Sequence, residues 1–134
     1  MTRVLADTSV WVTHLRGNSR ATSRLLAGNA DGSLTMTEPV AMELLAGARP
    51  GQVAALDQLV NAIPSLGILP DLDFRAAAAI KRAVRADGHT VRSLVDCLIA
   101  AVVLRHGDVV LVHDDIDFER IASVTDLRQE RWPA

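Results

Sequence analysis

Short apolar runs with the pattern of buried strands alternate along this sequence with longer segments that have the pattern of helices. Parallel strands need a crossover connection, usually a helix, so this alternation favours a mainly parallel sheet with helices on both faces. We therefore predict an α/β protein with a three-layer α/β/α architecture. The expected strands are residues 3–6, 33–36, 68–69, 108–112 and a last one within 124–131, and the expected helices are residues 9–16, 20–27, 38–46, 52–62, 71–86, 94–105 and 118–122.

Length and composition predict one domain that spans residues 1–134. A chain of 134 residues, of which 49% are hydrophobic, can bury a sizeable core. Cys97 is the only cysteine, which excludes an internal disulfide and suits a reducing cytoplasm. No signal peptide is recognised before Asp7, and the longest apolar stretch, residues 98–104, is far shorter than the roughly 20 residues of a membrane span. We expect a soluble, cytoplasmic protein that does not enter a membrane.

Acidic residues recur where the predicted strands end or the predicted helices begin. Asp7 and Asp115 lie just past strand ends, Asp96 lies in the first turn of a helix, and Glu43 lies early in another helix. In a right-handed parallel α/β unit, the carboxyl ends of the strands and the N-termini of the following helices share one edge of the sheet. We therefore predict that these four side chains form a single site.

Each of these acids also has a purely structural explanation. Asp7 can cap the helix that follows it, and Asp96 can complete a capping box with Ser93. Glu43 can belong to the polar face of an amphipathic helix, and the acidic segment 114–117 can be a solvated loop. A buried carboxylate is costly unless it is paired or bound to a metal, and no lysine or arginine stands where it guarantees such pairing. A divalent cation is therefore the partner that we expect.

The expected ion is Mg²⁺ or Mn²⁺, because both prefer hard oxygen ligands. Such an ion can activate water and stabilise the charge of a phosphodiester during hydrolysis. Asp7 and Asp96 are the expected direct ligands. Glu43 and Asp115 then complete a second metal position or orient water through the outer shell.

Other catalytic chemistries have less support in the sequence. The histidines are scattered and form no helical pair with metal-binding spacing, which argues against a zinc hydrolase. His113 borders the acidic loop, where it could contact a substrate, but a histidine at a strand end is more often structural. Cys97 follows Asp96 in an apolar helix and is expected to be inert packing.

Four segments of the chain resemble the successive motifs of PIN-domain ribonucleases, and more narrowly those of VapC toxins from bacterial toxin–antitoxin pairs. The segments occur in the family's order, and the resemblance extends over nearly the whole length of the chain; they are LADTSVW (5–11), VAMELLAG (40–47), DCLIAA (96–101) and DIDF (115–118). The resemblance implies a PIN-like fold and a Mg²⁺- or Mn²⁺-dependent endoribonuclease that cuts structured RNA, often tRNA or rRNA. It also implies a homodimer and a VapB-like antitoxin that blocks the site, often with an arginine.

The resemblance assigns roles to individual residues. The implied catalytic quartet is Asp7, Glu43, Asp96 and Asp115, and the implied metal ligands are Asp7, Asp96, Asp115 and Asp117. Ser9 stands where the family keeps a small hydroxyl residue, and Asp114 stands where a polar residue is usual, so both are accessory candidates. The division of roles among Asp114, Asp115 and Asp117 stays open at this point.

Two other classes of function stay open beside the nuclease. A Mg²⁺-binding phosphate-transfer domain of the receiver type could place acids at the same edge of a sheet, although such a site normally needs a basic residue after a late strand. A catalytically silent module that only binds a partner protein is the third reading. The complete set of acids argues against it.

Overall fold

The computed structural model describes residues 2–132, which form seven α-helices, one 3-10 turn and one four-stranded sheet. The strand order is β2-β1-β3-β4, and every pair in the sheet is parallel. The strands are β1 (Arg3–Ala6), β2 (Leu34–Thr35), β3 (Val109–His113) and β4 (Gln129–Arg131). The helices are α1 (Thr8–Leu15), α2 (Ser19–Asp31), α3 (Glu38–Ala46), α4 (Val53–Ala62), α5 (Pro70–Ala86), α6 (Leu94–Leu104) and α7 (Ile116–Ala122). The predicted α/β class with a mainly parallel sheet is confirmed.

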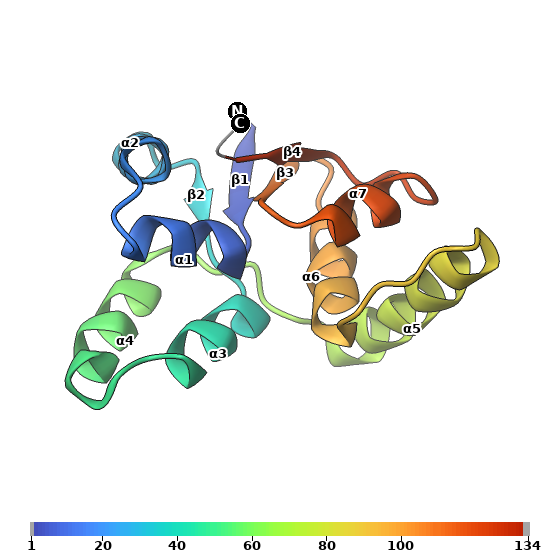
Figure 1. The fold of residues 1–134 in the computed structure, drawn as a ribbon, viewed down its shortest axis with the longest axis horizontal. Coiled ribbons are helices and arrows are strands. Elements are labelled where there is room, and N and C mark those ends of the chain that lie inside the picture. The colour runs from blue at the N-terminus through green and yellow to red at the C-terminus, as the bar shows by residue number, and fades with distance from the viewer. Residues whose placement is uncertain (1, 133–134) are drawn as a thin grey trace.

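The central pair of strands brings together two segments that are far apart in the sequence. β1 and β3 are parallel neighbours, and Ala6 lies beside Val112 at their carboxyl ends. The backbone N–H of Asp7 continues this pairing, because it donates to the carbonyl of Val112 over 2.9 Å. The chain therefore leaves both strands at the same edge of the sheet, where α1 begins after β1 and α7 follows β3 (Figure 1).

Side chains that cap the helices decide where several of them begin. The carboxylates of Asp7 and Asp115 cap α1 and α7, and the hydroxyl of Ser93 caps α6. Helix α7 starts two residues before the predicted position because Asp115 caps it. Helix α2 continues past the predicted end to Asp31 and stops at Gly32, whose φ of 78° lies in the left-handed region that glycine adopts without strain.

The predicted strand at residues 68–69 is wrong. Its backbone N–H groups bind side chains instead of a neighbouring strand: that of Ile68 donates to the carboxylate of Glu38, and that of Leu69 donates to Asp73. Because these groups already have partners, residues 68–69 form part of the connection between α4 and α5 and do not join the sheet.

The core lies between the sheet and the helices that cover it. Helix α6 is buried along most of its length, which explains its nearly continuous apolar sequence. The largest fully buried side chains include Phe118, Leu5, Ile99, Leu111 and Ile121, from β1, β3, α6 and α7. Each such side chain stabilises the fold by about 1.5–3 kcal/mol, so the elements that carry the acids are firmly held.

Among residues 2–132, none of the helices is both long enough and apolar enough to span a bilayer.

Candidate functional site

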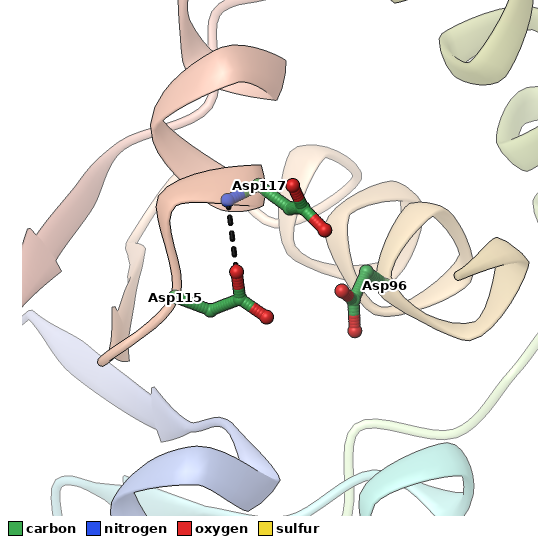
Figure 2. Close-up of side chains that lie close together, drawn as sticks. All are labelled: Asp96, Asp115 and Asp117. Carbon is green, nitrogen blue, oxygen red and sulfur yellow. Dashed lines mark hydrogen bonds between the residues drawn. The ribbon is translucent and has the colours of Figure 1, made fainter. Parts of the chain in front are cut away.

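Three aspartates converge at the edge of the sheet where β3 ends. An oxygen atom from each of Asp96, Asp115 and Asp117 lies within 4.8 Å of the other two. Figure 2 shows Asp115 and Asp117 at the start of α7 facing Asp96, which projects from α6. Asp117 is 1% exposed and Asp96 is 8% exposed, so little water screens the charges. This crowding is the central feature of the site.

Asp115 is held in place by the residues on either side of it. The N–H of Asp117 donates to Oδ1 of Asp115 over 3.0 Å, and the N–H of Asp115 donates to Nδ1 of His113 over 3.1 Å. Because Nδ1 accepts, the buried His113 ring carries its proton on Nε2, which donates to Gln129 Oε1 over 2.6 Å. The expectation that His113 is structural is confirmed, since it supports the backbone of the acidic loop.

Asp7 joins the site from the end of β1, where it also caps α1. Its Oδ2 accepts hydrogen bonds from the backbone N–H and from the hydroxyl of Ser9, over 3.0 and 2.6 Å. The same hydroxyl accepts from the N–H of Asp114 over 2.9 Å. Ser9 therefore links the segments that follow β1 and β3, which suits the accessory role predicted for it.

Glu43 reaches the same region from α3. Its Oε1 accepts a hydrogen bond of 2.7 Å from the hydroxyl of Thr8, which directly follows Asp7. This contact orients a side chain that the sequence places 35 positions away. The hydrogen bond from Thr8 was not predicted, although a hydroxyl residue beside Asp7 was visible in the motif.

Burial and neighbouring negative charges raise the pKa of two of these carboxyl groups, those of Asp96 and Asp7. The pKa of Asp96 is raised to about 7, first by burial and then by the negative charges of Asp7, Asp115, Glu43 and Asp117. Burial also raises the pKa of Asp7, against the hydrogen bonds from Ser9 and Thr8 and with a further contribution from Asp115. Asp7, Glu43, Asp115 and Asp117 therefore all lie close enough to act on the charge of Asp96.

Asp114 differs from its neighbours in the acidic loop. Its carboxylate accepts a 3.1 Å hydrogen bond from Nε of Arg131, at the end of β4. It is absent from the group of three aspartates whose oxygens converge among the described residues. The geometry thus separates Asp114 from Asp115 and Asp117, and its contribution to the site comes from its backbone N–H.

Two arginines at the site were missed by the sequence analysis. Arg92 contacts Oδ2 of Asp117 over 3.3 Å and Oδ1 of Asp115 over 3.4 Å. Arg120 contacts Oδ1 of Asp117 over 3.4 Å and donates to the carbonyl of Thr90 over 3.0 Å. The sequence showed no lysine or arginine whose position guaranteed pairing with the acids, but in the structure Asp115 and Asp117 both have arginine partners. The i, i+3 spacing of Asp117 and Arg120 in a helix was a usable signal, whereas nothing local pointed to Arg92.

The donor set nevertheless fits a divalent cation. Asp7 Oδ1 is buried, and within residues 2–132 it has no hydrogen-bond partner. An unpartnered, buried carboxylate oxygen is costly, and a cation is the group that relieves the cost. The oxygens of Asp96 and Asp115 are hard ligands of the kind that Mg²⁺ and Mn²⁺ prefer.

Comparison with known protein families gives one clear match. Residues 4–124 match the PIN domain. The chain is also 46% identical over 130 residues to VapC ribonuclease Mb1587 of Mycobacterium bovis, an alignment that covers 93% of this chain and 96% of that protein. Ribonuclease VapC11 of Mycobacterium tuberculosis matches with the same identity and the same coverage.

Solved structures agree on the fold. The toxin–antitoxin complex VapBC from Salmonella typhimurium, crystallised with DNA, contains a chain that superimposes with a TM-score of 0.77 at 18% identity, covering 98% of this chain and 99% of that one. A chain of VapBC-5 from Mycobacterium tuberculosis gives a TM-score of 0.71 at 21% identity, covering 98% and 99%. At these identities the likeness is one of architecture.

Proposed function

The chain belongs to the PIN-domain family, and we propose that it is a divalent-metal-dependent endoribonuclease of the VapC type. The identity to two VapC ribonucleases extends over nearly the full length of both chains, which supports treating residues 1–134 as a single PIN-like domain. Family membership sets aside the receiver-like phosphate-transfer domain. The complete set of carboxylates argues against a silent binding module.

The observation that carries the proposal is the crowding of acids around Asp96. A carboxyl group whose pKa stands at about 7 because of burial and four like-charged neighbours is poorly stabilised by the protein alone. We assign Asp7, Asp96, Asp115 and Asp117 as the residues that hold the ion, and Mg²⁺ or Mn²⁺ as the ion. When bound, such an ion supplies charge stabilisation at the phosphoryl oxygens and makes an attacking water more acidic.

The residues of this chain would orient the reactants. Two of the acids each have one oxygen fixed by the protein. Oδ2 of Asp7 accepts hydrogen bonds from Ser9, and Oδ1 of Asp115 accepts one from the N–H of Asp117. Glu43, fixed by Thr8, is suited to position the attacking water and to accept its proton. The water oxygen forms a bond to phosphorus while the bond to the leaving ribose oxygen breaks in line with it, so one phosphodiester linkage of the RNA is hydrolysed.

We further propose the biological setting that the family implies. The substrate is a structured RNA such as a tRNA or rRNA, the protein acts as a homodimer, and a VapB-type antitoxin holds it inactive. The similar solved structures named above are VapBC complexes, which supports the antitoxin as partner.

A direct test compares two site variants with a matched control. Asp96→Asn and Asp115→Asn keep the size of the side chain and should lower Mn²⁺-dependent cleavage of a tRNA and rRNA mixture by at least about a hundredfold, since metal ligation is worth several kcal/mol in the transition state. The control, Asp114→Asn, changes a residue of the same loop, but the carboxylate that it removes faces Arg131. Its cleavage activity should stay within about threefold of wild type. Cleavage that persists in EDTA, or in both site variants, contradicts the proposal.

A further inference from the structure

Arg92 is the residue at the rim of the site whose role the proposed nuclease mechanism leaves open. It stands directly before Ser93, the cap of α6, and its guanidinium reaches across to the start of α7. Its Nε and Nη2 contact Asp117 and Asp115, the two acids of the loop that face Asp96. A cation thus already lies against the proposed metal ligands.

These contacts are longer than those of two other ion pairs in the fold. The guanidinium of Arg3 holds Asp108 with two hydrogen bonds of 2.6 and 2.9 Å, and that of Arg105 holds Asp73 with two of 2.7 and 2.8 Å. Arg92 makes single contacts of 3.3 and 3.4 Å, longer than the roughly 2.7–2.9 Å that is usual for a charged hydrogen bond. Its side chain is 73% exposed, so it can leave these partners at little cost.

The architecture of the loop does not depend on this side chain. The backbone N–H of Arg92 donates to Oδ2 of Asp117 over 3.2 Å, and Arg120 binds the other oxygen of Asp117. Arg120 also holds the carbonyl of Thr90, and Lys81 holds that of Val91. The segment before α6 therefore stays anchored if the guanidinium moves.

We propose that Arg92 is a positioning residue that binds the scissile phosphate of the substrate. In the metal-free protein its guanidinium acts as a counterion of Asp115 and Asp117. Once the charge of these acids is neutralised, the guanidinium turns to a phosphate oxygen at the rim, where its planar fork of five N–H donors matches the anion. The inference rests on the proposed nuclease function and adds a residue to it.

The experiment compares Arg92→Ala and Arg92→Lys with Arg131→Ala. Arg131 is a suitable control because it also pairs with the acidic loop, through Asp114, and its side chain is 46% exposed. In Mn²⁺, Arg92→Ala should lower kcat/KM for RNA cleavage at least about tenfold, Arg92→Lys should recover part of the loss, and Arg131→Ala should stay within about threefold of wild type.

A second readout, made without RNA, separates positioning from a structural role. Calorimetric titration with Mn²⁺ should show equal or tighter binding by Arg92→Ala, because the substitution removes a cation that competes for the same carboxylates. Weaker Mn²⁺ binding together with a lower Tm would identify Arg92 as a structural counterion and overturn the inference. If Arg92→Ala cleaves RNA with the same kinetics as wild type, the inference is overturned and the proposed function is not. If the wild-type protein itself shows no metal-dependent cleavage, the proposed function and the inference fail together.

Discussion

Replacing Asp96 with asparagine should stabilise the metal-free protein at neutral pH. The pKa of Asp96 in the folded chain is about 7, raised first by burial and then by the surrounding carboxylates, whereas its ordinary value is 3.8. At any pH between these two pKa values, Asp96 keeps its proton in the folded state and has released it in the unfolded state. The associated stability is therefore complete below about pH 4 and is lost as the pH rises through about 7.

The size of the effect follows from the two pKa values. One pKa unit corresponds to about 1.4 kcal/mol. The difference between 3.8 and about 7 therefore lowers the free energy of unfolding of wild type by about 4 kcal/mol at pH 8, relative to low pH. Asparagine avoids this cost, but it gives up the favourable interaction of a negative charge with the first turn of α6, worth about 0.3–1 kcal/mol. Relaxation of the neighbouring acids reduces the difference further. We expect a net gain of about 2–3 kcal/mol, which for a domain of this size raises the Tm by roughly 8–12 °C.

The assay is thermal unfolding in EDTA at a series of pH values from 4 to 8, followed by circular dichroism. At pH 4 the Asp96→Asn variant and wild type should differ by less than about 1 kcal/mol, because Asp96 is then neutral in the folded state and only about half ionised in the unfolded state. Asp114→Asn serves as the control, since its carboxylate faces Arg131 and should give a change within about 1 kcal/mol at every pH. An Asp96→Asn variant that is no more stable than wild type at pH 8, or that gains equally at pH 4 and pH 8, would refute the reasoning.

Three further predictions concern single contacts and the ion. Ser9→Ala removes the hydroxyl that donates to Asp7 over 2.6 Å and should weaken both Mn²⁺ binding and RNA cleavage about tenfold; unchanged Mn²⁺ titrations would contradict this. Arg105→Ala leaves Asp73, which is 1% exposed, without its counter-charge and should lower the free energy of unfolding in urea by about 3 kcal/mol, with a loss below 1 kcal/mol arguing against it. Mn²⁺ at a hundred times its Kd should stabilise wild type by about 2.7 kcal/mol in the same urea assay. At that concentration Asp115→Asn should be stabilised much less, and equal stabilisation of the two proteins would exclude Asp115 as a ligand.

Much of the site could be predicted because its main acids follow local rules. Asp7 and Asp115 end strands and cap the helices that follow, and Asp96 lies in the first turn of α6. Such signals act within three or four residues, and the shared edge of a parallel sheet then converts three separate positions into one place. The register within the acidic loop was harder, since Asp114 and Asp115 are adjacent and have the same side chain.

The failed strand at residues 68–69 shows the limit of local patterns. An apolar pair between Gly67 and Pro70 has the appearance of a strand, but a strand needs a partner for its N–H groups. The carboxylate of Glu38, 30 positions earlier, takes that place for Ile68. No pattern within the segment itself reveals such a competitor.

The sequence by itself determined the α/β class, the elements that carry the acids and the convergence of those acids at one edge, because periodicity and capping are written in neighbouring residues. Only the tertiary structure decided that Arg92 reaches them and what holds His113 in place. Arg92 meets Asp115 and Asp117 from 23 and 25 positions away, and His113 is held by Gln129 on the adjacent strand. These contacts depend on how α6, α7 and the sheet pack together, and packing brings together side chains whose separation in the chain carries no signal of their distance in space.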